Sequence, residues 1–397
     1  MIYLDHNATT PPAPAVAQAV LAVLTEVWGN ASSQHAAGQD AKRALAAARA
    51  TVARVLGCKP AELVFTSGAT EANHLAVCGL LEAAPPGRRR LVLSAVEHSG
   101  HLKLARSLAA RGTLVDFIDV RPDGTLDMES AARLIGDDVA LVSLMAANNE
   151  TGVLMPVAQV RELAHGAGAR MHVDATQFIG KQPFNFAALG IDAVSLSAHK
   201  LRGPKGMGAL LLRQGVTLVP QVQGSQERQR RGGTENLPAI AGFAAALERL
   251  GDLAAETERL AALRDTLEAG LLRALPATHI FSAQAPRLPG TSYLRFGELS
   301  ADVVLQRLDR LGVAASSGAA CSSGGSEPSH VLAAMGVPRD AALAAVRLSL
   351  GETTTRQDID HLLAQLPPLL APLLAAESVP MSASSSAPRP EPAAQNH

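Results

Sequence analysis

The chain has 397 residues, of which 47% are hydrophobic and 18% charged, a composition typical of a folded globular protein with room for two domains. The formal net charge of −1 leaves no basic excess for nucleic acid, and three widely spaced cysteines exclude a disulfide framework or a CxxC zinc site. The N-terminus has no signal-peptide pattern, and we find no uninterrupted apolar stretch of membrane-spanning length. We therefore expect a cytoplasmic protein with neither a nucleic-acid nor a membrane partner.

Short apolar runs alternate with helical patterns through the first half of the chain. The expected strands are 62–66, 90–96, 113–120, 140–148, 169–175 and 192–199. The expected helices between them include 41–57, 128–136 and 157–168. This alternation predicts an α/β fold with a mostly parallel sheet and helices on both faces. The run 207–213 follows the strand 192–199 too closely for a crossover helix, which indicates an antiparallel strand.

The pattern changes near residue 240. A long helical stretch, broken near Gly251, covers 239–275, and further elements then follow: weaker strands at 290–296, 312–317 and 345–350, and helices at 300–311 and 356–371. These elements predict a second, smaller α+β domain. We expect a large domain over 15–255, a small domain formed by 1–14 plus 256–377, and a disordered Ser/Pro-rich tail at 378–397.

The motif TSGATEAN (66–73) directly follows an expected strand. Gly68 permits a tight turn, and Ala69 and Thr70 then open the next helix. Free backbone N–H groups at a helix start, together with the Thr70 hydroxyl, suit a single phosphate group. Taken alone, the same residues are better explained as an ordinary Ser/Thr helix cap.

The motif HVDATQ (172–177) places Asp174 at the end of an apolar strand. A buried carboxylate is costly without a cationic partner, and a protonated ring nitrogen of a cofactor would be such a partner. Gln177 lies close enough in sequence to reach the same ligand. An aspartate that caps the following helix is the alternative.

The motif SLSAHKLRGPKG (195–206) ends another expected strand. Ser197 and His199 share one face because side chains alternate along a strand, and Lys200 follows where the strand ends. A lone lysine in this position is usually a solvated charge. Combined with a phosphate cradle and an aspartate suited to a ring cation, Lys200 indicates pyridoxal phosphate bound through its amine.

Cys321 lies in SSGAACSSGGSEPSH (316–330), a stretch rich in Gly and Ser without apolar periodicity. We expect an exposed, mobile loop there. Free cysteines are usually buried, so a thiol on such a loop is better explained as a nucleophile than as core packing.

The sequence resembles a known family, the cysteine desulfurases of the NifS type. These are pyridoxal-phosphate enzymes of fold type I in the class V aminotransferase family. The matching motifs occur in order over roughly residues 1–370: YLDHNATT, NASSQHAAG, TSGATEAN, VEHSGH, ANNETG, HVDATQ, SAHKLRGPKG, RRGGTEN, SSGAACSSG and VRLSL. The resemblance implies a large domain with a mostly parallel sheet of seven strands, and a smaller α+β domain.

The resemblance also implies roles for individual residues. Catalysis would depend on Lys200, His98 and Cys321. The cofactor would be bound by Ala69, Thr70, His98, Asn149, Asp174, Gln177, Ser197, His199 and Lys200, with Asn149 and Gln177 on the side of its phenolic oxygen. Thr234 would reach the phosphate in the other subunit of a homodimer. The substrate would be bound by Arg347, which clamps its carboxylate, and by Asn7 and Asn30.

No metal ligand is expected, although Cys321 could transiently ligate an iron–sulfur cluster during transfer. Glu352 replaces an Arg that is common in the family and puts the usual charge of the substrate entrance in doubt.

The implied activity converts L-cysteine to L-alanine and leaves the sulfur on Cys321 as a persulfide. An iron–sulfur scaffold protein would then accept the sulfur, and the NifS resemblance suggests nitrogenase maturation. A selenocysteine lyase, an aminotransferase for a small amino acid, and a non-enzymatic sulfur carrier remain alternatives. The relative turnover of selenocysteine and cysteine would reveal a selenocysteine lyase. Amino exchange with a ketoacid would reveal an aminotransferase, and the absence of a visible Schiff-base band would indicate a non-enzymatic carrier.

Overall fold

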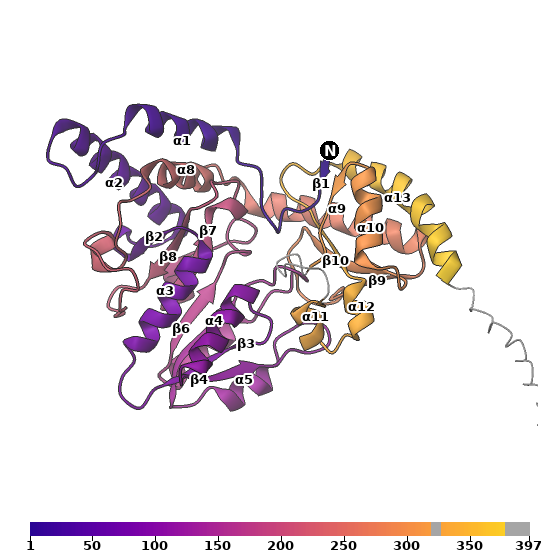
Figure 1. Cartoon of the computed structure of the whole chain (residues 1–397), viewed down its shortest axis with the longest axis horizontal. Coiled ribbons are helices and arrows are strands. Elements are labelled where there is room, and N and C mark those ends of the chain that lie inside the picture. Colours follow the sequence, from indigo (N-terminus) through magenta and orange to yellow (C-terminus); the bar gives the residue numbers. More distant parts are fainter. Residues whose placement is uncertain (319–326, 378–397) are drawn as a thin grey trace, which may run out of the picture.

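The computed structural model describes residues 1–318 and 327–377, and within them a seven-stranded sheet has the order β2-β8-β7-β6-β5-β3-β4 (Figure 1). Its strands are β2 (Leu63–Thr66), β3 (Arg90–Ser94), β4 (Leu114–Ile118), β5 (Val139–Met145), β6 (Arg170–Asp174), β7 (Ala193–Ser197) and β8 (Gly208–Leu212). Neighbours from β4 to β7 pair in parallel, whereas β8 runs antiparallel to both β7 and β2. The antiparallel strand expected at 207–213, shortly after the strand 192–199, is therefore present as β8.

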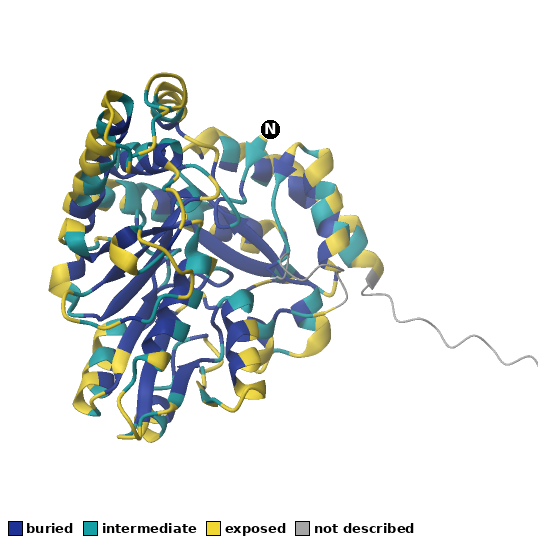
Figure 2. Ribbon diagram, turned by 60° about the vertical axis from the view of Figure 1, so that its left-hand side comes forward, coloured by how far each residue is buried: buried dark blue, intermediate teal, exposed yellow. Residues whose placement is uncertain are grey.

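Helices cover both faces of this sheet, and the alternation of side chains along the strands explains why. On β3, Leu91 and Leu93 belong to the core beneath α3 and α4, whereas Val92 belongs to the core on the opposite face. Figure 2 shows buried strands between helices whose outer faces are exposed. The helices of this part are α1 (Pro14–Glu26), α2 (Ala36–Leu56), α3 (Ala69–Glu82), α4 (Ser99–Ala110), α5 (Met128–Leu134), α6 (Val157–Gly166), α7 (Phe186–Leu189) and α8 (Leu237–Glu248).

A smaller part of the structure has its own sheets and its own hydrophobic core. In the described residues, β12, β10 and β9 form an antiparallel sheet, and β1 pairs in parallel with β11. Its strands are β1 (Ile2–Tyr3), β9 (Thr278–Ile280), β10 (Thr291–Phe296), β11 (Val313–Ala314) and β12 (Val346–Ser349). Its helices are α9 (Leu253–Ala274), α10 (Ala301–Arg310), α11 (His330–Ala334), α12 (Arg339–Leu343) and α13 (Arg356–Glu377).

The N-terminal residues connect the two parts. The chain begins at β1 beside β11, and then runs to α1, which packs against α8 in the larger part (Figure 1). The long helical stretch divides into α8 and α9 around residues 249–252, where the break near Gly251 is expected. The domain boundaries expected from the sequence stay a prediction.

Helix α13 is long and apolar enough to cross a membrane by length and composition alone, with a mean hydropathy of 1.3 over its most apolar window. No such stretch was expected from the sequence. In the structure, Ile359, Leu362, Leu366 and Leu370 form a fully buried stripe in the core of the smaller part. Their spacing of three to four residues is that of an amphipathic helix packed on a core, which accounts for the apolar content of α13.

Candidate active site

A cavity of about 630 Å³ lies where β5, β6 and β7 end and α3 begins. Parallel strands bring their carboxyl ends to one edge of a sheet, which is where open α/β sheets bind ligands. The predicted residues that line this cavity are Asn7, Ala69, Thr70, His98, Asn149, Asp174, Gln177, Ser197, His199, Lys200 and Arg347. The fold therefore gathers motifs from across the sequence into one site.

Asp174 ends β6 and is buried in the floor of the cavity. Its Oδ2 accepts a hydrogen bond from Asn73 Nδ2 at 2.7 Å, and its Oδ1 accepts one from the Thr176 backbone N–H at 3.0 Å. Burial by itself raises the pKa of Asp174, but the hydrogen bonds from Thr176 and Asn73 outweigh it and hold the pKa below its usual value. Asp174 is therefore an ionised carboxylate at neutral pH.

Lys200 lies in the short 3₁₀ turn Ala198–Lys200 that directly follows β7. Its Nζ donates to the backbone carbonyls of Asn7 at 2.6 Å and Ala8 at 2.7 Å. These carbonyls belong to the N-terminal segment, so two distant parts of the chain meet at the amine. The amine is thereby held at the wall of the cavity.

The start of α3 has the geometry of a phosphate cradle. Gly68 precedes the helix with a φ of +155°, and a Cβ built there would lie 3.9 Å from Ser197 Oγ. A side chain at this position would therefore enter the space between the helix start and Ser197. The free N–H groups of the first turn and the hydroxyls of Thr70 and Ser197 surround this space.

Two histidines in the cavity are neutral at physiological pH. Burial is the main cause that lowers the pKa of His98, and burial together with Lys200 and Lys205 lowers the pKa of His199 to about 4. His98 caps α4, and its Nδ1 accepts from the Gly100 backbone N–H at 3.2 Å. In the neutral form this bond places the ring proton on Nε2.

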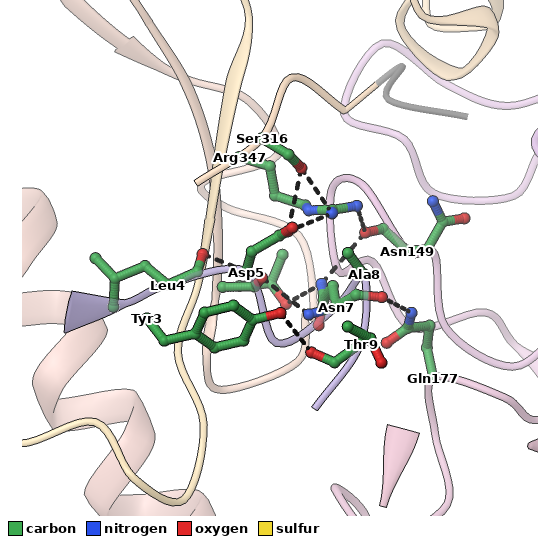
Figure 3. Close-up of polar contacts among 12 residues, drawn as sticks. Tyr3, Leu4, Asp5, Asn7, Ala8, Thr9, Asn149, Gln177, Ser316 and Arg347 are labelled. Atoms are coloured by element: carbon green, nitrogen blue, oxygen red, sulfur yellow. Dashed lines mark hydrogen bonds and ion pairs between the residues drawn. The ribbon is translucent and has the colours of Figure 1, made fainter. Parts of the chain in front are cut away.

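Arg347, on β12, reaches the cavity from the smaller part of the structure. Figure 3 shows its guanidinium held by three partners. Nη2 donates to Asp5 Oδ1 and to Ser316 Oγ, both at 2.9 Å, and Nη1 donates to the Asn149 carbonyl at 2.9 Å. A cation with a fixed orientation thus faces the same space as Lys200.

Three predicted residues are not placed in this cavity. Asn30 is exposed, and its side chain accepts from the Ser32 backbone N–H. Thr234 is also exposed and lines a separate cavity of about 140 Å³. Cys321, and with it the predicted mobile loop, lies outside the described residues. The same holds for the predicted disordered tail.

Glu352 is not among the residues that line this cavity. It pairs with Arg202 and Arg249 beside a neighbouring cavity of about 450 Å³. Burial raises the pKa of Glu352, but its contacts with the two arginines outweigh this and lower the pKa overall. The expectation about the charge of the substrate entrance stays a prediction.

Three residues that hold the site together were not expected from the sequence. Asn73 binds Asp174, Asp5 binds Arg347, and Lys181 binds both Asn7 and Gln177. The place of Asn73 at the site could have been predicted, because Asn73 lies one helical turn after Ala69 in the same motif. For Asp5 and Lys181 no local pattern indicates the partner.

The residues of the cavity fit pyridoxal phosphate. An ionised, buried Asp174 suits a protonated ring nitrogen, the start of α3 with its open Gly68 position suits a phosphate, and Lys200 supplies an amine. The volume is also of the size usual for cofactor sites. Together with the mostly parallel α/β sheet, this donor set defines a fold-type I pyridoxal-phosphate enzyme.

Comparison with known proteins agrees with this assignment. Residues 2–362 match the aminotransferase class-V family, and the chain belongs to that family, whose members use pyridoxal phosphate. It is 47% identical to a cysteine desulfurase of Cereibacter sphaeroides over 94% of this chain and 97% of that protein. It is 42% identical to the cysteine desulfurase NifS of Azotobacter vinelandii over 94% of this chain and 93% of that protein.

Solved structures show the same fold. A NifS-like protein, 34% identical, superposes with a TM-score of 0.87 and covers 93% of this chain and 99% of its own. The NifS-like protein of Rickettsia africae, 31% identical, gives a TM-score of 0.83 over 94% of this chain and 99% of its own. The predicted family, fold class and cofactor are confirmed.

Proposed function

We propose that this chain is a cysteine desulfurase that converts L-cysteine to L-alanine and transfers the sulfur to its own Cys321. The observation that carries the proposal is the single cavity that gathers Lys200, Asp174 and Arg347. Lys200 suits the amine linkage to the cofactor, Asp174 suits its ring nitrogen, and Arg347 suits the carboxylate of an amino acid. Similarity to cysteine desulfurases over nearly the whole chain supports the choice of substrate.

The cavity residues divide the work of binding. Asp174 would hold a proton at the ring nitrogen, and the start of α3 with Thr70 and Ser197 would hold the phosphate. When bound, pyridoxal phosphate supplies an electron sink for the α-carbon of the substrate. Arg347 would fix the substrate carboxylate and so orient the α-carbon towards Lys200.

Lys200 and His98 are the groups that move protons in this proposal. The Lys200 amine would remove the α-proton and later return a proton to the substrate carbon skeleton. Neutral His98 has Nδ1 occupied by the Gly100 N–H, which leaves Nε2–H as the donor towards a reacting group. Both residues line the cavity, as such roles require.

Cys321 is within reach of this site by chain length. Gly318 lines the cavity, and Cys321 follows three residues later, a span of at most about 11 Å. The Cys321 thiolate would attack the substrate sulfur as the C–S bond breaks and its electron pair returns to carbon, which then takes a proton. In sum, L-cysteine and one enzyme thiol give L-alanine and one enzyme persulfide.

The decisive experiment is anaerobic incubation of the purified holoprotein with L-cysteine, with alanine and sulfide measured together. Cys321→Ala should form no alanine, yet L-cysteine should still change the spectrum of the bound cofactor, because binding depends on other residues. Cys78→Ala, which changes a half-buried cysteine on α3, is the matched control and should keep full activity. Normal alanine formation by Cys321→Ala would refute the persulfide route.

We also propose that the active form is a homodimer. Leu21, Leu24 and Trp28 expose apolar surface on and just after α1, and Trp28 is 76% exposed. Asn30 lies two residues further on, and Thr234 is exposed as well, which suits roles towards a second subunit. Light scattering should give twice the chain mass, and Trp28→Asp should reduce it towards the monomer.

We further propose that the persulfide sulfur passes in the cytoplasm to an iron–sulfur scaffold protein, with nitrogenase maturation as the process served. The support is similarity to NifS of Azotobacter vinelandii. Anaerobic mixing of the holoprotein, L-cysteine, ferrous iron and a purified scaffold should produce the cluster absorption only when Cys321 is intact. Cluster formation at the same rate with Cys321→Ala would exclude this transfer.

A further inference from the structure

Lys181 is a partly buried amine that the proposed mechanism does not use. It lines the neighbouring 450 Å³ cavity rather than the cofactor cavity, and Asn7 and Lys200 line both. Its Nζ donates to Gln177 Oε1 at 2.6 Å and to Asn7 Oδ1 at 2.7 Å. Lys181 therefore lies behind the wall of the active site and touches it through two carboxamides.

These contacts fix which way each carboxamide points. Asn7 Nδ2 donates to the Asn149 carbonyl at 3.2 Å and to Thr291 Oγ1 at 3.0 Å, so Asn7 Oδ1 faces Lys181. Gln177 Nε2 donates to the Asn7 carbonyl at 2.8 Å, so Gln177 Oε1 also faces Lys181. If either amide were turned over, its N–H groups would face the Lys181 amine, and its oxygen would face another oxygen atom.

The Asn7 carbonyl connects the two lysines. It accepts from Gln177 Nε2 and also from Lys200 Nζ, and the segment around it is drawn with Gln177, Asn149 and Arg347 in Figure 3. An amine retains at least two N–H groups in either protonation state, so Lys181 can donate to both carboxamides whether charged or neutral. Burial, followed by Lys200 and Arg347, lowers the pKa of Lys181 well below its usual value.

We propose that Lys181 is a positioning residue that locks Gln177 with its N–H₂ edge towards the cofactor and holds Asn7 beneath Lys200. The inference rests on the proposed function and on the position that the family resemblance implies for Gln177, beside the phenolic oxygen of the cofactor. An N–H donated to that oxygen disfavours the protonated form of the neighbouring Lys200 linkage, because both protons compete for the same oxygen. Loss of Lys181 removes one of the two contacts that orient Gln177, the other being the Asn7 carbonyl, and so weakens this competition.

Lys181→Met is the test, with the exposed Lys103→Met on α4 as the matched control. The readout is the pH midpoint at which the visible band of the bound cofactor changes. Lys181→Met should raise this midpoint by about one unit, the usual size of an effect from one neighbouring group, whereas Lys103→Met should leave it unchanged. An unchanged midpoint in Lys181→Met would overturn the proposal.

Two further variants separate positioning from a loss of stability or charge. Lys181→Gln keeps one donor, so it should shift the midpoint by less than Lys181→Met, and it serves alone if the methionine variant does not fold. In a Gln177→Leu background, Lys181→Met should shift the midpoint by at most half as much. An equal shift there would show that Lys181 does not act through Gln177.

The same experiment distinguishes this inference from the proposed function. If the unmodified protein shows no pH-dependent visible band and forms no alanine, the proposed function fails. If it shows both and the Lys181 variants titrate like the unmodified protein, the proposed function stands and the positioning role is refuted.

Discussion

Arg347→Lys tests the binding of the substrate carboxylate most directly, because lysine keeps the positive charge and loses the planar fork. Arg347 is 4% exposed, and its bonds to Asp5, Ser316 and Asn149 use three of its five N–H groups. One hydrogen on Nη1 remains, as does Nε–H, for which no partner occurs among the described residues. Nε–H is buried and lies on the Nη2 edge of the guanidinium, away from Nη1, so the remaining Nη1 hydrogen is the donor that a substrate carboxylate can use.

The expected magnitude follows from this one donor. A hydrogen bond to a charged group contributes about 1.5–3 kcal/mol, so Arg347→Ala should lose about 1.5–3 kcal/mol of transition-state binding, or about 10- to 100-fold in kcat/KM. Arg347→Lys keeps the positive charge but not the position of this donor, and should lose about 10-fold. Most of the loss should appear as a higher KM for L-cysteine.

The assay is the initial rate of alanine formation against L-cysteine concentration. Arg356→Lys is the control, because Arg356 forms an exposed pair with Asp360 on α13. The visible band of the bound cofactor should be the same in all variants, which shows that the cavity is intact. A folded Arg347→Lys protein whose KM stays within about twofold of the unmodified value would refute the carboxylate role.

Lys200→Ala should abolish alanine formation and the visible band of the lysine-bound cofactor, although the cofactor can remain in the cradle; full turnover would contradict the role of Lys200. Glu268→Gln breaks a buried pair with Arg287, whose side chains are 10% and 6% exposed, and should lower the free energy of unfolding in denaturant by about 3 kcal/mol. A loss below about 1 kcal/mol would contradict this reasoning. Burial and nearby cations lower the pKa of His6 to about 4, below its unfolded value, so its contribution to stability is full above about pH 6.5 and is lost as the pH falls towards 4. Between pH 7.5 and pH 4, the free energy of unfolding should therefore fall by about 3 kcal/mol less in His6→Asn than in the unmodified protein. An equal fall in both proteins would show that His6 does not contribute to the pH dependence of stability.

Local pattern predicted much of the large sheet. The runs that became β5, β6 and β7 are short, apolar and separated by helices, and the connection of ten residues before β8 is too short for a crossover. Helix α1 and strand β9 were not identified. In α1 the alanine-rich sequence exposes much of its apolar surface, so no clear buried stripe marks it, and β9 has only three residues.

The sequence by itself determined the class of the protein and most of its site, because the key side chains lie at the ends of predicted parallel strands. The carboxyl ends of parallel strands meet at one edge of the sheet, so the position of Asp174, Ser197 and Lys200 at predicted strand ends was enough to group them. Only the tertiary structure showed which groups hold them. Asn73 binds Asp174 across 101 positions, Lys181 binds Asn7 across 174, and Asp5 binds Arg347 across 342. Such contacts depend on how whole elements pack against each other, and neither strand nor helix periodicity carries that information.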